Sequence, residues 1–415
     1  MAVRSGVSLV SGDGRWLHPC FATSRASPAA NFRANGSLVE YRNAALPWAW
    51  DAASGTPLGL AIEEARQNYV TNPRMEGATN GVIGSGGVAP TSLSISVNGT
   101  SCEIANAGTT QNGVPVVDLR WFGTPNATTT LAASFMSNTA IVAASGETWS
   151  ARCHVARVGG SLTNITSPRL LLMGRTADGA SLTEAVTVGF TDTSALTPIS
   201  GTQTLAQGTT ARFNARFDFA VTNGQAVDVT YRLGATQIEK AAFVSSPVLP
   251  TAGTPASATR SATTITAPAT ALPGYNAAEG TMVVRARLAG VSGFQIPWAL
   301  DDGTANNRIM VDSNAGAIRF TIVTGGATQH QLALGSVTAG ADFTVAASWS
   351  AAGAAASLNG AAAATGGALT VPTTPTLRLG HRGSTPTAYV NGTIRRLVYL
   401  PRRVTNAEVV QLAAG

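Results

Sequence analysis

The sequence predicts an all-β protein in which two tandem β-sandwiches follow a small N-terminal module. Two observations support this fold class. Apolar and polar residues alternate with a period of two in many short segments, as in half-buried strands. Turn signals separate these segments, among them Asn112-Gly113, Asp178-Gly179 and Asn223-Gly224. Little in the sequence resembles a catalytic centre.

The composition excludes several classes of protein. Hydrophobic residues make up 44% of the 415 residues and charged residues only 12%. A disordered chain combines low hydrophobicity with high net charge, so disorder is not expected. No apolar run approaches the roughly 18–20 residues of a membrane-spanning helix, so we expect no membrane insertion. The length suggests two or three domains.

The basic residues are almost all arginines. Lys240 is the only lysine among 27 basic residues, and the net charge is +6. A GC-rich genome explains this bias. The alternative is a preference for acidic partners, because the planar guanidinium group pairs with carboxylates and phosphates as lysine does not. No basic run is interleaved with aromatic residues, so nucleic-acid binding is not expected.

Three cysteines, Cys20, Cys102 and Cys153, are an odd number, and the N-terminus lacks the apolar stretch of a secretion signal. We therefore expect no disulfide framework, with Cys102 and Cys153 as buried thiols. The chain is expected to fold in the cytoplasm of the cell that makes it. If it works outside that cell, it leaves by lysis or without a cleaved signal.

Residues 1–68 form the predicted N-terminal module. A helical pattern is expected over 58–69, with Leu60 facing a core and Glu63 facing water. Large aromatic side chains are concentrated in this short segment: Trp16, Trp48 and Trp50. They predict docking on a neighbouring domain or another protein, and a self-contained small core is the alternative.

Residues 69–250 form the first predicted sandwich. Strands are expected over 116–122, 149–155 and 227–232, because apolar and polar residues alternate there. Core positions are expected on one face of these strands: Val117, Leu119, Trp121, Trp149, Ala151, Cys153 and Val155.

Residues 251–273 are rich in proline, threonine, alanine and serine, and form a linker or an extended strand between domains. Residues 274–415 form the second predicted sandwich. Near the end, Thr405 is expected to cap a short helix, because Glu408 three residues later completes the capping-box spacing.

Three groups of residues resemble known families. Residues 21–27, 36–40 and 59–68 resemble an N-terminal module shared by tailed-phage structural proteins and particle-borne fibres and spikes, with Ala61 where leucine is more usual. Three further stretches resemble jelly-roll carbohydrate-binding modules: 72–77, 112–120 and 146–149. Two others resemble the concanavalin A-like or laminin G-like sandwich: 391–396 and 401–403.

These resemblances imply a spike or fibre on the surface of a virion or gene transfer agent, and the head spike of a gene transfer agent is a close variant. The implied partners are a host cell-surface polysaccharide such as capsule and other particle proteins, and the implied oligomer is a homotrimer. The module would be the particle-attachment site. Its candidate residues are Arg25, Trp48, Trp50, Glu63, Glu64 and Arg66.

Glycan binding requires aromatic faces for sugar rings and planar polar groups for hydroxyls or carboxylates. In the first sandwich the candidates lie on the face opposite the core: Asp118, Arg120, Arg152, His154, Arg175 and Arg232. A solvated face of surface ion pairs is the alternative. In the second sandwich the candidates are Trp298, His381, Arg382 and Tyr389.

Catalysis is not expected. A glycoside hydrolase needs two carboxylates about 5–9.5 Å apart across a cleft, and the adjacent pairs Glu63-Glu64 and Asp301-Asp302 do not obviously supply them. No cofactor is expected. Calcium remains an alternative, because hard oxygen ligands are present in the second sandwich, namely Asp301, Asp302, Asp312 and Asn314.

The sequence therefore predicts an adhesin that captures a host glycan through weak, multivalent contacts. A capsid decoration protein that binds only particle proteins is the alternative, and a capsule depolymerase is a third possibility.

Overall fold

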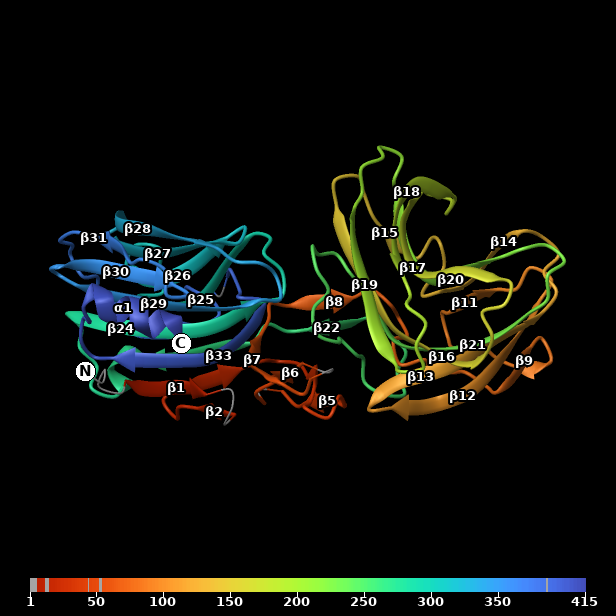
Figure 1. Cartoon of the computed structure of the whole chain (residues 1–415), viewed down its shortest axis with the longest axis horizontal. Helices are drawn as coiled ribbons and strands as arrows, with labels where there is room; N and C mark the ends of the chain where they lie inside the picture. The colour runs from red at the N-terminus through yellow and green to blue at the C-terminus, as the bar shows by residue number, and fades with distance from the viewer. Residues whose placement is uncertain (1–5, 12–14, 44, 52–53, 386) are drawn as a thin grey trace. The chain divides into compact units, whose positions relative to one another are not determined.

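The computed structural model describes residues 6–11, 15–43, 45–51, 54–385 and 387–415 (Figure 1). The chain folds into two units. Unit 1 contains the described residues of 1–65 together with 261–415, and unit 2 contains residues 66–260. Each unit is built from two stacked, almost entirely antiparallel sheets. The predicted all-β fold with tandem sandwiches is confirmed.

Sheet A of unit 1 has nine strands. They are β1 (Val7–Ser11), β2 (Trp16–Leu17), β6 (Trp48–Trp50), β7 (Pro57–Ile62), β24 (Glu279–Leu288), β29 (Asp342–Ser350), β30 (Gly353–Leu358), β31 (Ala364–Gly366) and β33 (Gly392–Leu400). β33 pairs with β24 along one edge and with both β1 and β7 along the other. Figure 1 shows these N-terminal strands beside β33.

Sheet B of unit 1 has seven strands. They are β3 (Ala22–Ser24), β23 (Thr264–Pro268), β25 (Phe294–Asp301), β26 (Arg308–Asn314), β27 (Ala317–Thr324), β28 (Ala327–Ser336) and β32 (Thr376–Leu379). The core lies between sheets A and B and includes Val284, Trp298, Phe320 and Trp349. A separate hairpin is formed by β4 (Ala29–Phe32) and β5 (Leu38–Tyr41).

Two short helical segments complete unit 1. A 3-10 turn, η1 (Ala269–Ala271), follows β23. Helix α1 (Asn406–Ala414) begins after Thr405, whose side chain accepts from the Glu408 backbone while Glu408 accepts from the Thr405 backbone. The predicted capping box is therefore confirmed. The helix packs Val409 and Ala413 onto the outer face of sheet A.

Unit 2 also has two sheets. Sheet C contains β9 (Gly81–Ile83), β10 (Gly86–Gly87), β12 (Ser101–Gln111), β13 (Val114–Gly123), β16 (Thr148–Gly160), β19 (Thr197–Thr204) and β21 (Val227–Glu239). Sheet D contains β11 (Ser94–Ser96), β14 (Thr129–Ser134), β15 (Ile141–Val142), β17 (Ile165–Arg175), β18 (Ser181–Gly189) and β20 (Arg212–Val221). A short ribbon pairs β8 (Arg66–Asn68) with β22 (Ala258–Arg260).

The core of unit 2 follows the predicted alternation. Trp121 contacts Phe219 edge-on at 5.3 Å between ring centroids, and Trp149 stacks on Phe213 at 5.2 Å. The predicted core positions on β13 and β16 are all buried. Cys102 and Cys153 are buried free thiols, as predicted.

Three features of the chain differ from the sequence-based expectations. The helix expected over 58–69 is wrong, because β7 and β8 occupy this stretch. Leu60 and Ile62, two residues apart, both face the core of unit 1. Pairing with β33 therefore overrides the local helical pattern.

The boundaries of the N-terminal module and of the linker also differ. Described residues of 1–65 supply strands to both sheets of unit 1 rather than forming a module apart. Within 251–273, β23 is an interior strand between β32 and β3, which fits the extended-strand alternative better than a free linker. Within the described part of the chain, no helix is long and apolar enough to cross a membrane.

Candidate binding site

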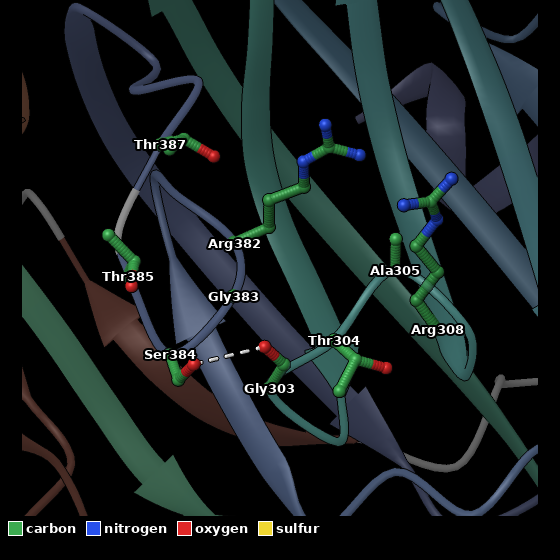
Figure 2. Close-up of a pocket in the computed structure, with 9 residues that line it drawn as sticks. All are labelled: Gly303, Thr304, Ala305, Arg308, Arg382, Gly383, Ser384, Thr385 and Thr387. Atoms are coloured by element: carbon green, nitrogen blue, oxygen red, sulfur yellow. Dashed lines mark hydrogen bonds between the residues drawn. The ribbon is translucent and has the colours of Figure 1, made fainter.

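A pocket lies on the face of sheet B that is turned away from the core (Figure 2). One wall is the loop between β25 and β26, and the other is the loop between β32 and β33. The cavity has a volume of about 240 Å³. Its described lining residues are Gly303, Thr304, Ala305, Arg308, Arg382, Gly383, Ser384, Thr385 and Thr387.

Asp301 fixes both loops in place. Its side chain is 1% exposed, and its carboxylate accepts hydrogen bonds from the backbone N–H of Gly303 at 2.8 Å and of Gly383 at 3.0 Å. The same carboxylate accepts from Nε of Arg378 at 2.8 Å. One buried acid therefore ties together the two walls and the strand between them.

A second set of contacts shapes the first wall. Asp302 accepts from the backbone N–H and the hydroxyl of Thr304 at 2.8 and 2.7 Å, and from the Asn307 amide at 2.8 Å. Gly303 has a φ of +89°, in the left-handed region that favours glycine. Its carbonyl accepts from the backbone N–H of Ser384 at 3.0 Å, which joins the walls directly.

Two arginines supply the charge of the pocket. Arg308 begins β26 and Arg382 lies on the opposite wall, and Figure 2 shows both guanidinium groups extending toward the same side. Among the described residues neither forms a salt bridge, because Asp301 is held by Arg378 and Asp312 by Arg319. The Arg382 guanidinium lies 4.9 Å from the centroid of the Phe294 ring, which holds it over the sheet.

Arg308 experiences this excess charge directly. Burial, and after it the positive charge of Arg382, lowers the pKa of the Arg308 guanidinium. Its Nε is buried without a hydrogen-bond partner. A bound anion would relieve the repulsion between the two guanidinium groups.

The chemistry of the pocket suits a small, hydroxylated anion. Thr304, Ser384, Thr385 and Thr387 line the pocket together with the two arginines, and no carboxylate or thiol lines the described part of the cavity. Drug-sized sites measure about 300–1,000 Å³. This cavity is smaller, so the part of a ligand that enters it is small.

Three of the candidates in the first sandwich form ion pairs on the outer face of sheet C. Arg232 binds Asp118 with both nitrogens of one edge, at 2.7 and 2.8 Å. Arg120 binds Asp228 in the same manner at 2.9 and 2.8 Å and also contacts Glu103. This arrangement matches the alternative of a lattice of ion pairs, but Asp118 is buried, with 4% of its surface exposed, rather than solvated.

The other three candidates in the first sandwich lie on two different sheets. Arg152 and His154 lie on β16, where His154 is only 2% exposed. Arg175 is 2% exposed and lies on β17, in sheet D rather than sheet C. The expectation that all these arginines share one sheet is therefore wrong.

Acidic pH is expected to destabilise unit 2 through His154. Burial, and after it the charge of Arg152, lowers the pKa of His154 from 6.5 to about 3. Between these values the unfolded chain binds a proton that the folded chain excludes, so stability falls as pH falls. From pH 7 to 5 the loss is roughly 2 kcal/mol. Urea titrations at both pH values measure it.

His154→Gln should flatten this pH dependence, whereas His330→Gln at a partly exposed position should not. Equal slopes for wild type and His154→Gln would contradict the assignment. His381 should likewise make unit 1 less stable as pH falls, because burial lowers the pKa of its side chain to about 4.

In the second sandwich, one of the four candidates reaches the pocket. Arg382 lines it. Trp298 and His381 are fully buried, and Tyr389 is 8% exposed. Trp298 packs in the core between the sheets, so its indole cannot stack on a ligand. His381 and Tyr389 do not line the pocket, and their roles in sugar binding stay predictions.

The six candidate attachment residues lie in both units. Arg25 is 3% exposed and donates to the backbone carbonyls of Ser27 and Arg42. Trp48 lies in the core of unit 1, and Trp50 packs against it. These contacts assign Arg25 and Trp48 to the interior, not to a free surface.

The remaining attachment candidates follow β7. The backbone N–H of Glu64 donates to the Asn391 side chain, and the backbone carbonyl of Glu63 accepts from Thr263. Arg66 belongs to unit 2, where it lies over the Phe243 ring and 3.9 Å from Glu239. Of the three tryptophans expected to dock on a partner, Trp16 is the exposed one, with 41% of its surface accessible to solvent.

The calcium candidates are not assembled into a site. Asp312 is fully buried and accepts from Arg319 Nε and from the Thr321 hydroxyl, both at 2.7 Å. Asp301 and Asp302 are engaged by the loop contacts described above. In the described ranges of the chain, no three His, Cys, Asp or Glu side chains come together as metal ligands.

Sequence reasoning missed most of the pocket, namely Arg308 and the residues that surround it. The sequence assigns Asp301 and Asp302 only to the alternative of a calcium site. The available signal was a threonine- and serine-rich loop, 384–387, next to Arg382.

No protein-family model and no curated protein matches the sequence. Similar solved structures include the CBM40 of the Ruminococcus gnavus IT-sialidase bound to α2,3-sialyllactose, with 17% identity and a TM-score of 0.30 over 34% of this chain and 85% of that one. The CBM22-1 xylan-binding domain of Paenibacillus barcinonensis Xyn10C has 15% identity and a TM-score of 0.26, over 43% and 97%.

A mutant Trypanosoma rangeli sialidase with trans-sialidase activity has 14% identity and a TM-score of 0.29, over 37% of this chain and 26% of that one. Similarity of this extent carries no argument about ligands. The function proposed for this chain rests on the geometry of its pocket.

Proposed function

We propose that this chain is a non-catalytic carbohydrate-binding protein whose unit 1 pocket binds the carboxylate of an acidic sugar. The observation that carries the proposal is the pair Arg308 and Arg382. Each lacks a carboxylate partner among the described residues, and both line one small cavity rich in hydroxyl groups. A carboxylate accepts hydrogen bonds from guanidinium groups with matched planar geometry.

The residues of the pocket are suited to binding a ligand rather than to catalysing a reaction. Two acids border the walls, and neither lines the cavity. Asp301 is buried and engaged by three donors, and the Asp302 carboxylate accepts from Thr304 and Asn307, so neither is placed to transfer a proton to a ligand. A general acid must lie within hydrogen-bond reach of the atom it protonates. The pocket therefore offers positive charge and hydroxyl groups, which suffice for binding.

We extend the proposal to the setting of the protein. The resemblance of residues 21–27, 36–40 and 59–68 to particle-borne fibres and spikes supports a place on the surface of a virion or gene transfer agent. There the chain would adsorb the particle to host polysaccharide such as capsule. A homotrimer with one pocket per chain would gain avidity from weak single sites.

Replacement of Arg382 tests the pocket. Arg382→Ala is expected to weaken binding of an acidic glycan about tenfold to a hundredfold, because a hydrogen bond to a charged group contributes about 1.5–3 kcal/mol. Arg382→Lys should also bind more weakly, since lysine keeps the charge but not the planar geometry. Calorimetric titration of host capsule oligosaccharide into the full chain measures both.

Arg285→Ala is the matched control, because it removes the same charge from a surface ion pair on sheet A of the same unit. It should bind like the wild type. Equal affinity for the acidic oligosaccharide and its carboxyl-reduced form would contradict the proposal. Silence toward every host glycan would favour the alternative of a decoration protein.

A further inference from the structure

The outer face of sheet D in unit 2 carries a cluster of four arginines. Strands β17 and β20 pair along their length, and their apolar residues face the core. On the opposite face the register sets Arg175 directly across from Arg212, and Arg216 lies four residues further along β20, with Asn214 between them. The remaining member, Arg169, stands across from Asp218.

One acidic side chain, that of Asp218, forms salt bridges with this cluster. Asp218 is fully buried and accepts from Nε of Arg169 at 2.7 Å and from Nε of Arg216 at 2.8 Å. Unit 2 is described in full, and within it Arg175 and Arg212 form no salt bridge. Like charges directly opposite one another on neighbouring strands destabilise a sheet.

The environment of Arg175 makes this excess charge more costly. Its side chain is 2% exposed, and Nη1 donates to the carbonyl of Gly179 at 2.8 Å and to the Ser181 hydroxyl at 3.2 Å. The other edge of the guanidinium group, Nε and Nη2, is buried without a hydrogen-bond partner, as is Nε of Arg212. Burial, followed by the charge of Arg216, lowers the pKa of Arg175 to about 10, so it stays charged at neutral pH.

We propose that this face is an oxyanion-binding site, at which Arg212 contacts a carboxylate, sulfate or phosphate group while Arg175 and Arg216 add their charge. Arg212 is partly exposed, so an anion reaches it from solvent. The bound anion neutralises the positive charge of Arg175 and Arg212, which no carboxylate of unit 2 pairs with. This inference rests on unit 2 alone and does not depend on the unit 1 pocket.

Arg212→Met tests the site with little risk to the fold. Arg212 is partly exposed, and its one side-chain hydrogen bond is a long 3.4 Å contact with the carbonyl of Ala211. Without added oxyanion, the variant is expected to melt at or above the wild-type temperature, because the repulsion with Arg175 is removed. On addition of anion, the wild type should gain melting temperature and the variant should not.

The probes are sodium sulfate, sodium phosphate and sodium glucuronate, each titrated into the full chain at constant ionic strength. Calorimetry should show at least tenfold weaker binding of the active probe by Arg212→Met. A response to glucuronate alone identifies a sugar carboxylate, and a response to sulfate or phosphate alone identifies a tetrahedral anion. No response to any of the three overturns the proposal.

Two further variants locate the response. Arg157→Met removes an exposed arginine from sheet C of the same unit, where it pairs with Asp192, and should retain the wild-type shift. Arg382→Ala should retain it as well. Loss of the shift in Arg382→Ala but not in Arg212→Met would assign the anion to unit 1 and overturn the proposal.

Discussion

A chain that begins at Arg66 is expected to lose the fold of unit 1 while unit 2 remains folded. Deleting residues 1–65 removes β1, β2, β6 and β7 from sheet A and β3 from sheet B. It also removes four fully buried aliphatic side chains from the core, those of Leu9, Val10, Leu60 and Ile62. Their burial contributes about 6–12 kcal/mol, which is comparable to the whole stability of a domain.

The deletion also exposes the edge of β33. That edge, paired with β1 and β7 in the intact chain, would present free backbone groups and invite aggregation. Limited proteolysis followed by mass spectrometry measures the outcome, and we expect a resistant fragment spanning roughly residues 66–260. That fragment expressed alone is the control and should be folded, since its core is made within the unit.

The opposite outcome would follow if the N-terminal segment were a separable attachment module. A truncated chain in which residues 261–415 still resist protease and unfold cooperatively would contradict the contribution assigned to β1 and β7. In that case the boundary predicted at residue 68 would describe the molecule better than the pairing with β33.

The sequence predicted the features that depend on neighbouring residues. The alternation of Val117, Leu119 and Trp121 placed all three in the core, because successive side chains of a strand point to opposite faces. Thr405 and Glu408 predicted the start of α1, because a capping box lies within four residues. Both signals are local and need no knowledge of strand order.

Features set by distant pairing were not predictable in this way. Residues 58–62 have a helical pattern in isolation, but in the fold the backbone of Glu64 binds Asn391, 327 residues away. The ion pairs Asp118–Arg232 and Arg120–Asp228 depend on the register between β13 and β21. The sequence of neither strand specifies that register.

The candidate site was hidden for the same reason. Arg382 was a candidate because it lies in a loop near a predicted strand end, whereas Arg308 was not noticed. The two meet because the loop after β32 folds back over the outer face of sheet B, where Gly383 binds Asp301. Trp298 was predicted to bind sugar but lies in the core, since an aromatic side chain suited to stacking on a sugar is equally suited to packing in a core.

Loss of the Asp301 carboxylate is expected to have the second large effect. Asp301→Ala leaves Arg378, whose side chain is 11% exposed, without its partner, and removes the acceptor for two backbone N–H groups. Removing one member of a buried ion pair costs about 3–5 kcal/mol. Urea unfolding should show this loss, and glycan binding should weaken because both walls of the pocket are released.

Asp342→Ala is the matched control for stability. Asp342 also binds arginines, Arg285 and Arg287, but its side chain is 22% exposed on sheet A, away from the pocket loops. Water replaces much of what is lost there, so the cost should stay below about 1 kcal/mol and binding should be unchanged. Asp301→Asn should also be destabilised, because its single amide oxygen can accept from only one of the two walls and it removes the charge that Arg378 requires. If Asp301→Ala unfolded at the wild-type urea concentration and bound glycan normally, then Asp301 would neither anchor the loops nor shape the site.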